Sequence, residues 1–221
     1  MGIGEGDMVV LDRLRKDYPT GGKCAVLGHC TFFFDGGSKE AFRDRLKFDS
    51  VETFDINGTP DHKLDLQEEL GPEFKGKYDW IVDAGTLFCI FDVPSAWKNL
   101  LYMLKDDGKI WHQSTLVGHF GRSFWAFSPS VFGEFYSANG FEVKEMGYMI
   151  KSNGKYSWTN CPTNQYYLQS ATQDSFQFSP NTTTYQGPVV CDTNLMCFAT
   201  RKENKKYERP IPEHYIRTNG S

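Results

Sequence analysis

The feature of this sequence that most constrains its fold is the stretch from Lys77 to Ser114, which alternates between strand and helix patterns. Residues 80–82 form a short apolar run that predicts a strand buried on both faces. From 93 to 104, apolar side chains recur at helical spacing, and residues 109–113 return to a strand pattern. This spacing predicts a βαβ unit with parallel strands and a right-handed crossover.

The parallel arrangement also predicts where a ligand binds. In an open parallel sheet, ligands lie outside the carboxyl ends of the strands. Residues 83–86 follow the first strand of the unit, and residues 112–114 lie at the end of the second. We therefore expect these two segments to face one crevice, where the chemistry of the protein should take place.

The rest of the chain repeats this alternation of strands and helices. The sequence predicts a covering helix at 7–18, strands at 23–28, 50–56 and 62–66, a helix that begins after Ser38, a helix at 128–140, and strands that begin at 141 and 195. This order is typical of a three-layer α/β domain. At 221 residues, the chain is too short for two comfortable domains, so we expect a single domain spanning 1–221.

Two segments lack this periodicity. Residues 150–192 are polar and rich in Asn, Thr, Gln and Tyr, which indicates an insertion that is a lid, a contact surface or partly disordered. Residues 202–221 are charged and contain proline, so we expect a tail that is mobile or packed on a partner.

Composition limits the partners of the protein. The net charge is -4 and no run is rich in Lys and Arg, which argues against nucleic acid as the main partner because clustered cations bind phosphates. The sequence has no signal-peptide pattern and no segment of membrane-spanning length, so we expect no membrane partner and a cytoplasmic protein. No spacing matches a metal-ligand motif, so no metal site is predicted. Association into a homo-oligomer is left open.

An acid at the end of the second strand bears on the choice of cofactor. In dinucleotide-binding folds, a carboxylate at the place of Asp55 accepts hydrogen bonds from ribose hydroxyls, although Asp55 is also suited to capping the turn at Asn57. No G-x-G-x-x-G follows the first strand, which disfavours a nicotinamide dinucleotide because its pyrophosphate needs close backbone approach. Adenosyl sulfonium compounds carry a cation, which suits a crevice with Asp55, Asp65 and Asp83 at its mouth.

Six segments together resemble the class I S-adenosylmethionine-dependent methyltransferases. They are CAVLGH at 24–29, VETFDI at 51–56, KLDL at 63–66, YDWIVDAGT at 78–86, LKDDGKIWHQS at 104–114 and FSPSVFGEFYSANGFEV at 127–143. The first segment stands where the family has its glycine-rich motif, with a single glycine, and the second carries the ribose-binding acid. The resemblance implies a Rossmann-like fold with a mostly parallel, seven-stranded sheet whose last strand is antiparallel.

The resemblance also implies which residues bind S-adenosylmethionine. By their place in the motifs, they are Gly28 and His29 near the methionine end, Asp55 and Ile56 at the ribose, Asp65 and Leu66 at the adenine, and Asp83, Ala84 and Gly85 along the floor of the site.

Two histidines are candidates for the catalytic base. Methyl transfer to oxygen or nitrogen requires an aligned acceptor and often a group that takes its proton, and histidine suits this at neutral pH. His119 lies in an aromatic, glycine-rich loop that also suits the stacking of a sugar or ring substrate, and His112 lies near the end of the preceding strand. The alternatives are that His112 packs into the sheet and that His119 is a surface residue.

The sequence therefore predicts S-adenosylmethionine-dependent methyl transfer to a small molecule, such as a sugar, a nucleotide-linked compound or a secondary metabolite. A methyltransferase-like binding or scaffold protein without catalysis is the alternative. A nicotinamide-dependent oxidoreductase ranks third, because the glycine fingerprint is missing.

Overall fold

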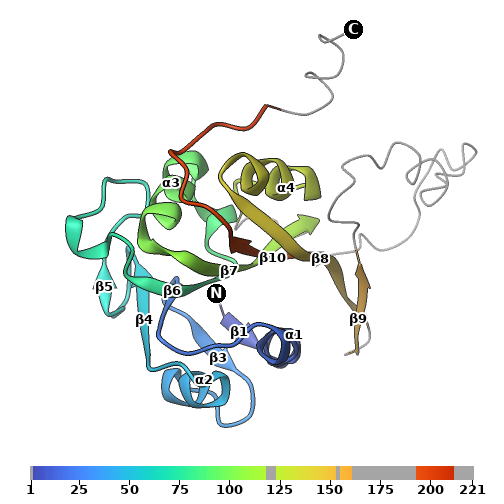
Figure 1. Ribbon diagram of the computed structural model, residues 1–221. Coiled ribbons are helices and arrows are strands. Elements are labelled where there is room, and N and C mark those ends of the chain that lie inside the picture. The colour runs from blue at the N-terminus through green and yellow to red at the C-terminus, as the bar shows by residue number, and fades with distance from the viewer. Residues whose placement is uncertain (1, 118–122, 153–154, 161–192, 212–221) are drawn as a thin grey trace, which may run out of the picture.

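The computed structural model describes residues 2–117, 123–152, 155–160 and 193–211. One large sheet separates two layers of helices (Figure 1). Helices α1 (Glu5–Asp17) and α2 (Lys39–Leu46) cover one face, and α3 (Val93–Met103) and α4 (Pro129–Ala138) cover the other. The predicted three-layer α/β architecture is confirmed.

The main sheet has eight strands in the order β5-β4-β2-β6-β7-β10-β8-β9. They are β2 (Lys23–Leu27), β4 (Ser50–Asp55), β5 (His62–Lys63), β6 (Tyr78–Ala84), β7 (Leu104–Val117), β8 (Phe141–Ser152), β9 (Lys155–Asn160) and β10 (Thr193–Arg201). Strands β5, β4, β2, β6 and β7 are parallel, and β10 lies antiparallel between β7 and β8. The prediction of seven strands with an antiparallel last strand is confirmed, and β9 adds an eighth at the edge.

Three short elements were not predicted. Strand β9 pairs with β8 inside the segment expected to be an insertion, at 150–192, of which residues 161–192 lie outside the described part. Strands β1 (Gly2–Gly4) and β3 (Thr31–Phe33) form a separate two-stranded sheet. Edge and two-stranded pairings rest on backbone hydrogen bonds and need no apolar face, so the side-chain pattern does not reveal them. Two single 3-10 turns, Pro72–Phe74 and Leu87–Cys89, complete the described elements.

Each helix layer is held to the sheet by the apolar stripe that predicted it. Met8, Leu11 and Leu14 of α1 are buried against the face of β2 and β6. On the other face, the Trp97 ring of α3 stacks on the Phe135 ring of α4 at 4.6 Å. Asp92 caps α3, because its carboxylate accepts a hydrogen bond from Ser95 N.

The described part of the C-terminal segment, residues 202–211, makes hydrogen bonds to the end of α4 and the turn that follows it. The Asn139 amide donates to Glu208 O and accepts from Glu208 N, both at 2.9 Å. Lys202 N also donates to Gly140 O at 2.8 Å. The expectation of a tail that is mobile or packed on a partner stays a prediction, and residues 212–221 lie outside the described part.

A membrane-spanning helix is absent from the described residues, since none of their helices is both long enough and apolar enough.

Leu100 tests the packing of α3, because its side chain is only 1% exposed within the core. Leu100→Ala should lower the free energy of unfolding by about 2–5 kcal/mol, through lost apolar burial and the cavity left behind. Chemical denaturation measures this, with the exposed Lys98→Ala of the same helix as control. A loss below about 0.5 kcal/mol would show that α3 does not pack on the sheet as described.

Candidate functional site

The carboxyl ends of the parallel strands bring the predicted binding residues to one edge of the sheet. Asp83 is the register partner of both Leu27 and His112, and Leu27 is also the partner of Phe54. Strands β2, β4 and β6 therefore end within one residue of the same level, beside His112 of β7, which continues to Val117. The residues at or just beyond these ends are Gly28, His29, Asp55, Ile56, Asp65, Leu66, Asp83, Ala84, Gly85 and His112. We call this the carboxyl edge. His119 lies outside the described residues.

Asp55 is held by the backbone of the first strand's loop. Gly28 takes a positive φ of 88°, which favours glycine, and its N–H donates to Phe54 O at 2.6 Å. The chain then turns so that His29 N donates to one Asp55 carboxylate oxygen at 2.5 Å, while Asn57 N donates to the other at 2.8 Å. Each oxygen of this half-buried carboxylate keeps a further lone pair, so Asp55 can still accept from a ligand hydroxyl.

Asp65 is brought next to Asp55 by the pairing of β5 with β4. Leu64 N donates to Asp55 O at 3.1 Å, which continues the parallel ladder. The Asp65 carboxylate accepts from Gln67 N at 2.9 Å, and Gln67 in turn accepts from Asp92 N at 2.8 Å. Asp65, the acid expected beside the adenine, is thus connected through Gln67 to the loop before α3.

A buried chain of hydrogen bonds links β6, β7 and α4 beneath the carboxyl edge. Asp83, 1% exposed, accepts from His112 Nδ1 at 2.8 Å through one oxygen. Its other oxygen accepts from Thr86 N at 2.7 Å and from Leu87 N at 3.3 Å. His112 Nε2 bonds to the Tyr136 hydroxyl. Asp83 therefore fixes the turn after β6 that forms part of the edge.

The proton positions in this chain follow from the donors available. Burial raises the pKa of Tyr136 well above its usual range, so the phenol keeps its proton and donates to His112 Nε2. His112 Nδ1 then carries the other proton and donates to Asp83. Both ring nitrogens are occupied and the side chain is 0% exposed, so His112 has no contact with the surface of the edge. These surroundings are those of a side chain packed into the sheet, the alternative given for His112 above.

An acid that the sequence analysis did not single out also lies at this edge. Helix α1 precedes β2 and lies antiparallel to it, and β1 pairs with β3 just beyond β2, so the start of α1 lies at the carboxyl edge. There Asp7, 4% exposed, accepts from Gly4 N at 2.8 Å through one oxygen, while its other oxygen is buried without a hydrogen-bond partner. Burial raises the pKa of Asp7 to about 6, against the opposing effect of the Gly4 bond.

Two buried hydroxyls at the edge are also unpaired. Thr86 Oγ1 follows β6 and Ser114 Oγ lies near the end of β7, and neither has a hydrogen-bond partner among the residues that the structure describes. Buried polar atoms are normally paired, so three unpaired atoms near one edge, with Asp7, indicate a place for a polar ligand or water. Among the described residues, no three His, Cys, Asp or Glu side chains gather as a metal site would require.

Exposed aromatic rings stand beside the edge. Phe91, Phe124 and Trp125, which we call the aromatic rim, are 67%, 64% and 41% exposed. Phe124 N donates to Phe88 O and Trp125 Nε1 donates to Ile90 O, both at 2.9 Å. These bonds hold the loop after β7 against the loop after β6.

Comparisons with known proteins find this fold in solved methyltransferases. N-methyltransferase NodS of Bradyrhizobium japonicum WM9, solved with S-adenosylhomocysteine, has a TM-score of 0.53 at 13% identity, covering 90% of this chain and 89% of that chain. The 1,6-didemethyltoxoflavin-N1-methyltransferase of Burkholderia thailandensis gives 0.52 at 12% identity, covering 89% and 78%. A candidate methyltransferase of Bacillus halodurans C-125 gives 0.51 at 10% identity, covering 88% and 99%. No family model and no curated protein matches the sequence. At such identities the likeness shows the fold alone.

Tyr136→Phe tests the buried chain. Removal of the hydroxyl leaves His112 Nε2 unpaired in a fully buried place, so the free energy of unfolding should fall by about 1–3 kcal/mol. Urea denaturation measures the loss. The control is Tyr102→Phe on α3, whose hydroxyl has no hydrogen bond among the described residues. Equal stability of the two variants would contradict the assignment.

Proposed function

We propose that this chain, a domain of the class I methyltransferase fold, transfers a methyl group from S-adenosylmethionine to a small-molecule acceptor. The observation that carries the proposal is the position of Asp55, at the end of β4 and beside Gly28 at the end of β2. An acid at this place in a doubly wound sheet is suited to the ribose hydroxyls of an adenosyl cofactor. Two of the neighbours above are solved with S-adenosylhomocysteine bound, which supports the same class of cofactor.

The charge of the carboxyl edge fits this cofactor. When bound, S-adenosylmethionine supplies an electrophilic methyl group on a sulfonium cation, together with an ammonium group. The edge offers Asp55 and Asp65, with Asp83 beneath them and a buried, unpaired oxygen on Asp7. Carboxylates stabilise a nearby cation, most strongly where burial excludes water. The residues proposed to hold the cofactor are those that the resemblance implies. They are Gly28 and His29 for the methionine end, Asp55 and Ile56 for the ribose, Asp65 and Leu66 for the adenine, and Asp83, Ala84 and Gly85 for the floor of the site.

The aromatic rim supports an acceptor that contains a ring. Phe91 lies 5.5 Å from Phe124 and 6.1 Å from Trp125, measured between ring centroids. Exposed aromatic faces of this kind stack on planar or sugar rings. The Burkholderia neighbour, solved with bound 1,6-didemethyltoxoflavin, is an example of this fold with a small organic molecule.

Two histidines receive different roles in the proposal. His119 is the proposed base that takes the acceptor's proton. His112 is a positioning residue, because it contacts Asp83 and Tyr136 and acts on the edge through Asp83.

A binding or scaffold protein without catalysis is the second candidate. It is favoured by the bonds from His29 N and Asn57 N to Asp55, which satisfy both carboxylate oxygens without any ligand. Calorimetry separates the candidates, since only the first requires S-adenosylmethionine binding.

Asp55→Asn tests the cofactor assignment. The substitution keeps the shape of the side chain but removes its charge, so the affinity for S-adenosylhomocysteine should fall by about 10- to 150-fold, as expected for a charge-assisted hydrogen bond worth about 1.5–3 kcal/mol. Isothermal calorimetry on a folded variant provides the measurement, and the exposed Glu40→Gln serves as control. Wild-type affinity in Asp55→Asn would remove Asp55 from the site.

His119→Ala tests the proposed base. General-base catalysis is typically worth about 10²- to 10⁴-fold in rate, so single-turnover methyl transfer should slow by such a factor while cofactor affinity stays unchanged. The acceptor for this assay would come from a screen of ring-bearing alcohols and amines with methyl-labelled cofactor. An unchanged rate would exclude His119 as the base.

A further inference from the structure

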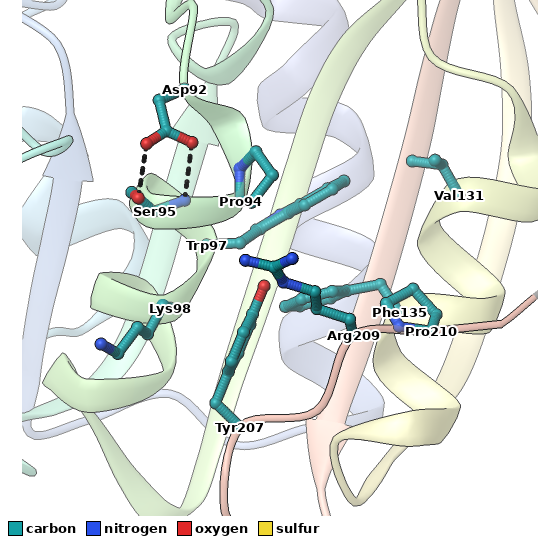
Figure 2. A pocket seen from close by; sticks show the side chains of 10 residues that line it. All are labelled: Asp92, Pro94, Ser95, Trp97, Lys98, Val131, Phe135, Tyr207, Arg209 and Pro210. Atoms are coloured by element: carbon teal, nitrogen blue, oxygen red, sulfur yellow. Dashed lines mark hydrogen bonds between the residues drawn. The ribbon is translucent and has the colours of Figure 1, made fainter.

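A concave surface distinct from the carboxyl edge lies on the outer side of the α3 and α4 layer. This groove, about 820 Å³ in volume, lies between the two helices and the C-terminal segment. Its lining residues are Asp92, Pro94, Ser95, Trp97, Lys98, Val131, Phe135, Tyr207, Arg209 and Pro210 (Figure 2). None of the residues assigned to the cofactor is among them. Small-molecule sites commonly measure about 300–1,000 Å³ and combine apolar walls with a few convergent polar groups.

The floor of the groove is aromatic. Trp97 and Phe135 stack with their ring centroids 4.6 Å apart and their planes inclined by 17°. Tyr207 adds a third ring, with its centroid 6.4 Å from that of Phe135. Figure 2 shows Tyr207 and Arg209 pointing from the C-terminal segment into the groove, towards Trp97. Trp97 and Phe135 are only 7% and 2% exposed, and Trp97 also stacks on Phe127, so these two rings form a closed base. The half-buried Tyr207 is the lining ring that a planar ligand can contact.

The wall that carries Arg209 is fixed before any ligand arrives. Asn139, 2% exposed at the end of α4, makes two hydrogen bonds to the backbone of Glu208, next to Arg209. Asn139 is itself anchored, because its amide also donates to Phe135 O at 2.8 Å. A preformed wall reduces the ordering cost of binding.

The two cationic side chains of the groove make no ion pair within the described part of the chain. Arg209 and Lys98, which lies at the rim, form no ion pair with any described residue. Asp92, the single carboxylate of the lining, is engaged as the cap of α3 by Ser95 N and Ser95 Oγ, at 3.3 and 2.6 Å. The hydrogen bond from Ser95, with a smaller effect of Arg209, holds the pKa of Asp92 below its usual range. The lining therefore has an excess of one positive charge.

We propose that this groove binds a planar organic anion, a small molecule whose aromatic ring carries a carboxylate or sulfonate. The ring packs against Tyr207, the half-buried ring of the lining, and the acid group pairs with Arg209. A guanidinium suits this ligand because it both pairs with a carboxylate in a forked geometry and packs against aromatic faces. Lys98, at the mouth of the groove, adds a favourable positive charge whose effect is weakened by salt. The groove shares no residue with the proposed cofactor site, so this proposal does not depend on the proposed methyl transfer.

The test is a calorimetric titration of the full chain with naphthalene-1-carboxylate, with the neutral naphthalene-1-methanol as the matched ligand. The carboxylate should bind, and Arg209→Gln should weaken it by about threefold to tenfold, the range expected for a partly exposed, charge-assisted pair. The neutral alcohol should bind more weakly than the carboxylate and should not distinguish Arg209→Gln from wild type. Lys206→Gln removes an exposed cation from the same segment outside the lining and should change nothing.

Four results would overturn the proposal. They are absence of carboxylate binding at millimolar concentration, equal affinity for the neutral alcohol, full affinity in Arg209→Gln, and an equal loss in Lys206→Gln, which would indicate general attraction to cations. Asp55→Asn provides the control for place, because a ligand in the groove does not contact the carboxyl edge. Naphthalene-1-carboxylate should therefore bind a folded Asp55→Asn with wild-type affinity, whereas an anion bound at the acidic edge would gain affinity from the loss of the Asp55 charge.

Discussion

The arrangement of the carboxyl edge depends on one buried carboxylate. Asp83 lies one residue before the end of β6 and is 1% exposed, and its three hydrogen-bond donors come from β7 and from the turn after β6. Such a group is stable in the core only while its donors are in place, because a buried charge that loses its partner costs about 3–5 kcal/mol. The bonds fix the turn at Thr86 and couple it, through His112 and Tyr136, to α4. The carboxyl edge therefore rests on a series of buried hydrogen bonds, from Asp83 through His112 to Tyr136, inside an otherwise apolar layer.

The elements that could be predicted from sequence are those whose information is local. The stripe of α3 and the acid that ends β4 lie within single segments, and the structure has each of them where the sequence predicted it. The partners of Asp83 could not be predicted, because Tyr136 lies in an apolar stripe that accounts for its ring but not for its hydroxyl. Asp7 was missed for the same reason, since its burial is a tertiary property. Asn139 lies at the end of the helix predicted at 128–140, and it also holds the C-terminal segment through its bonds to Glu208, which the sequence pattern does not reveal.

Two surfaces of opposite charge result from this fold. The carboxyl edge gathers Asp55 and Asp65, with Asp7 and Asp83 buried beside them, which favours a cationic ligand. The groove of α3 and α4 has Arg209 over aromatic rings and favours an anion. Both surfaces adjoin α3, whose amino end is tied to the edge by the bond from Asp92 N to Gln67. Electrostatics therefore assigns different ligands to neighbouring surfaces of a chain whose net charge is only -4.

A crystal structure of the chain with S-adenosylhomocysteine tests the central claim most directly. The account predicts that the ligand lies along the carboxyl edge, with its ribose hydroxyls within about 2.6–3.2 Å of the Asp55 carboxylate and its adenine beside Asp65 and Leu66. The amino-acid end should lie near Gly28. A ligand found in the groove of α3 and α4, or crystals that take up none at saturating concentration, would contradict the account.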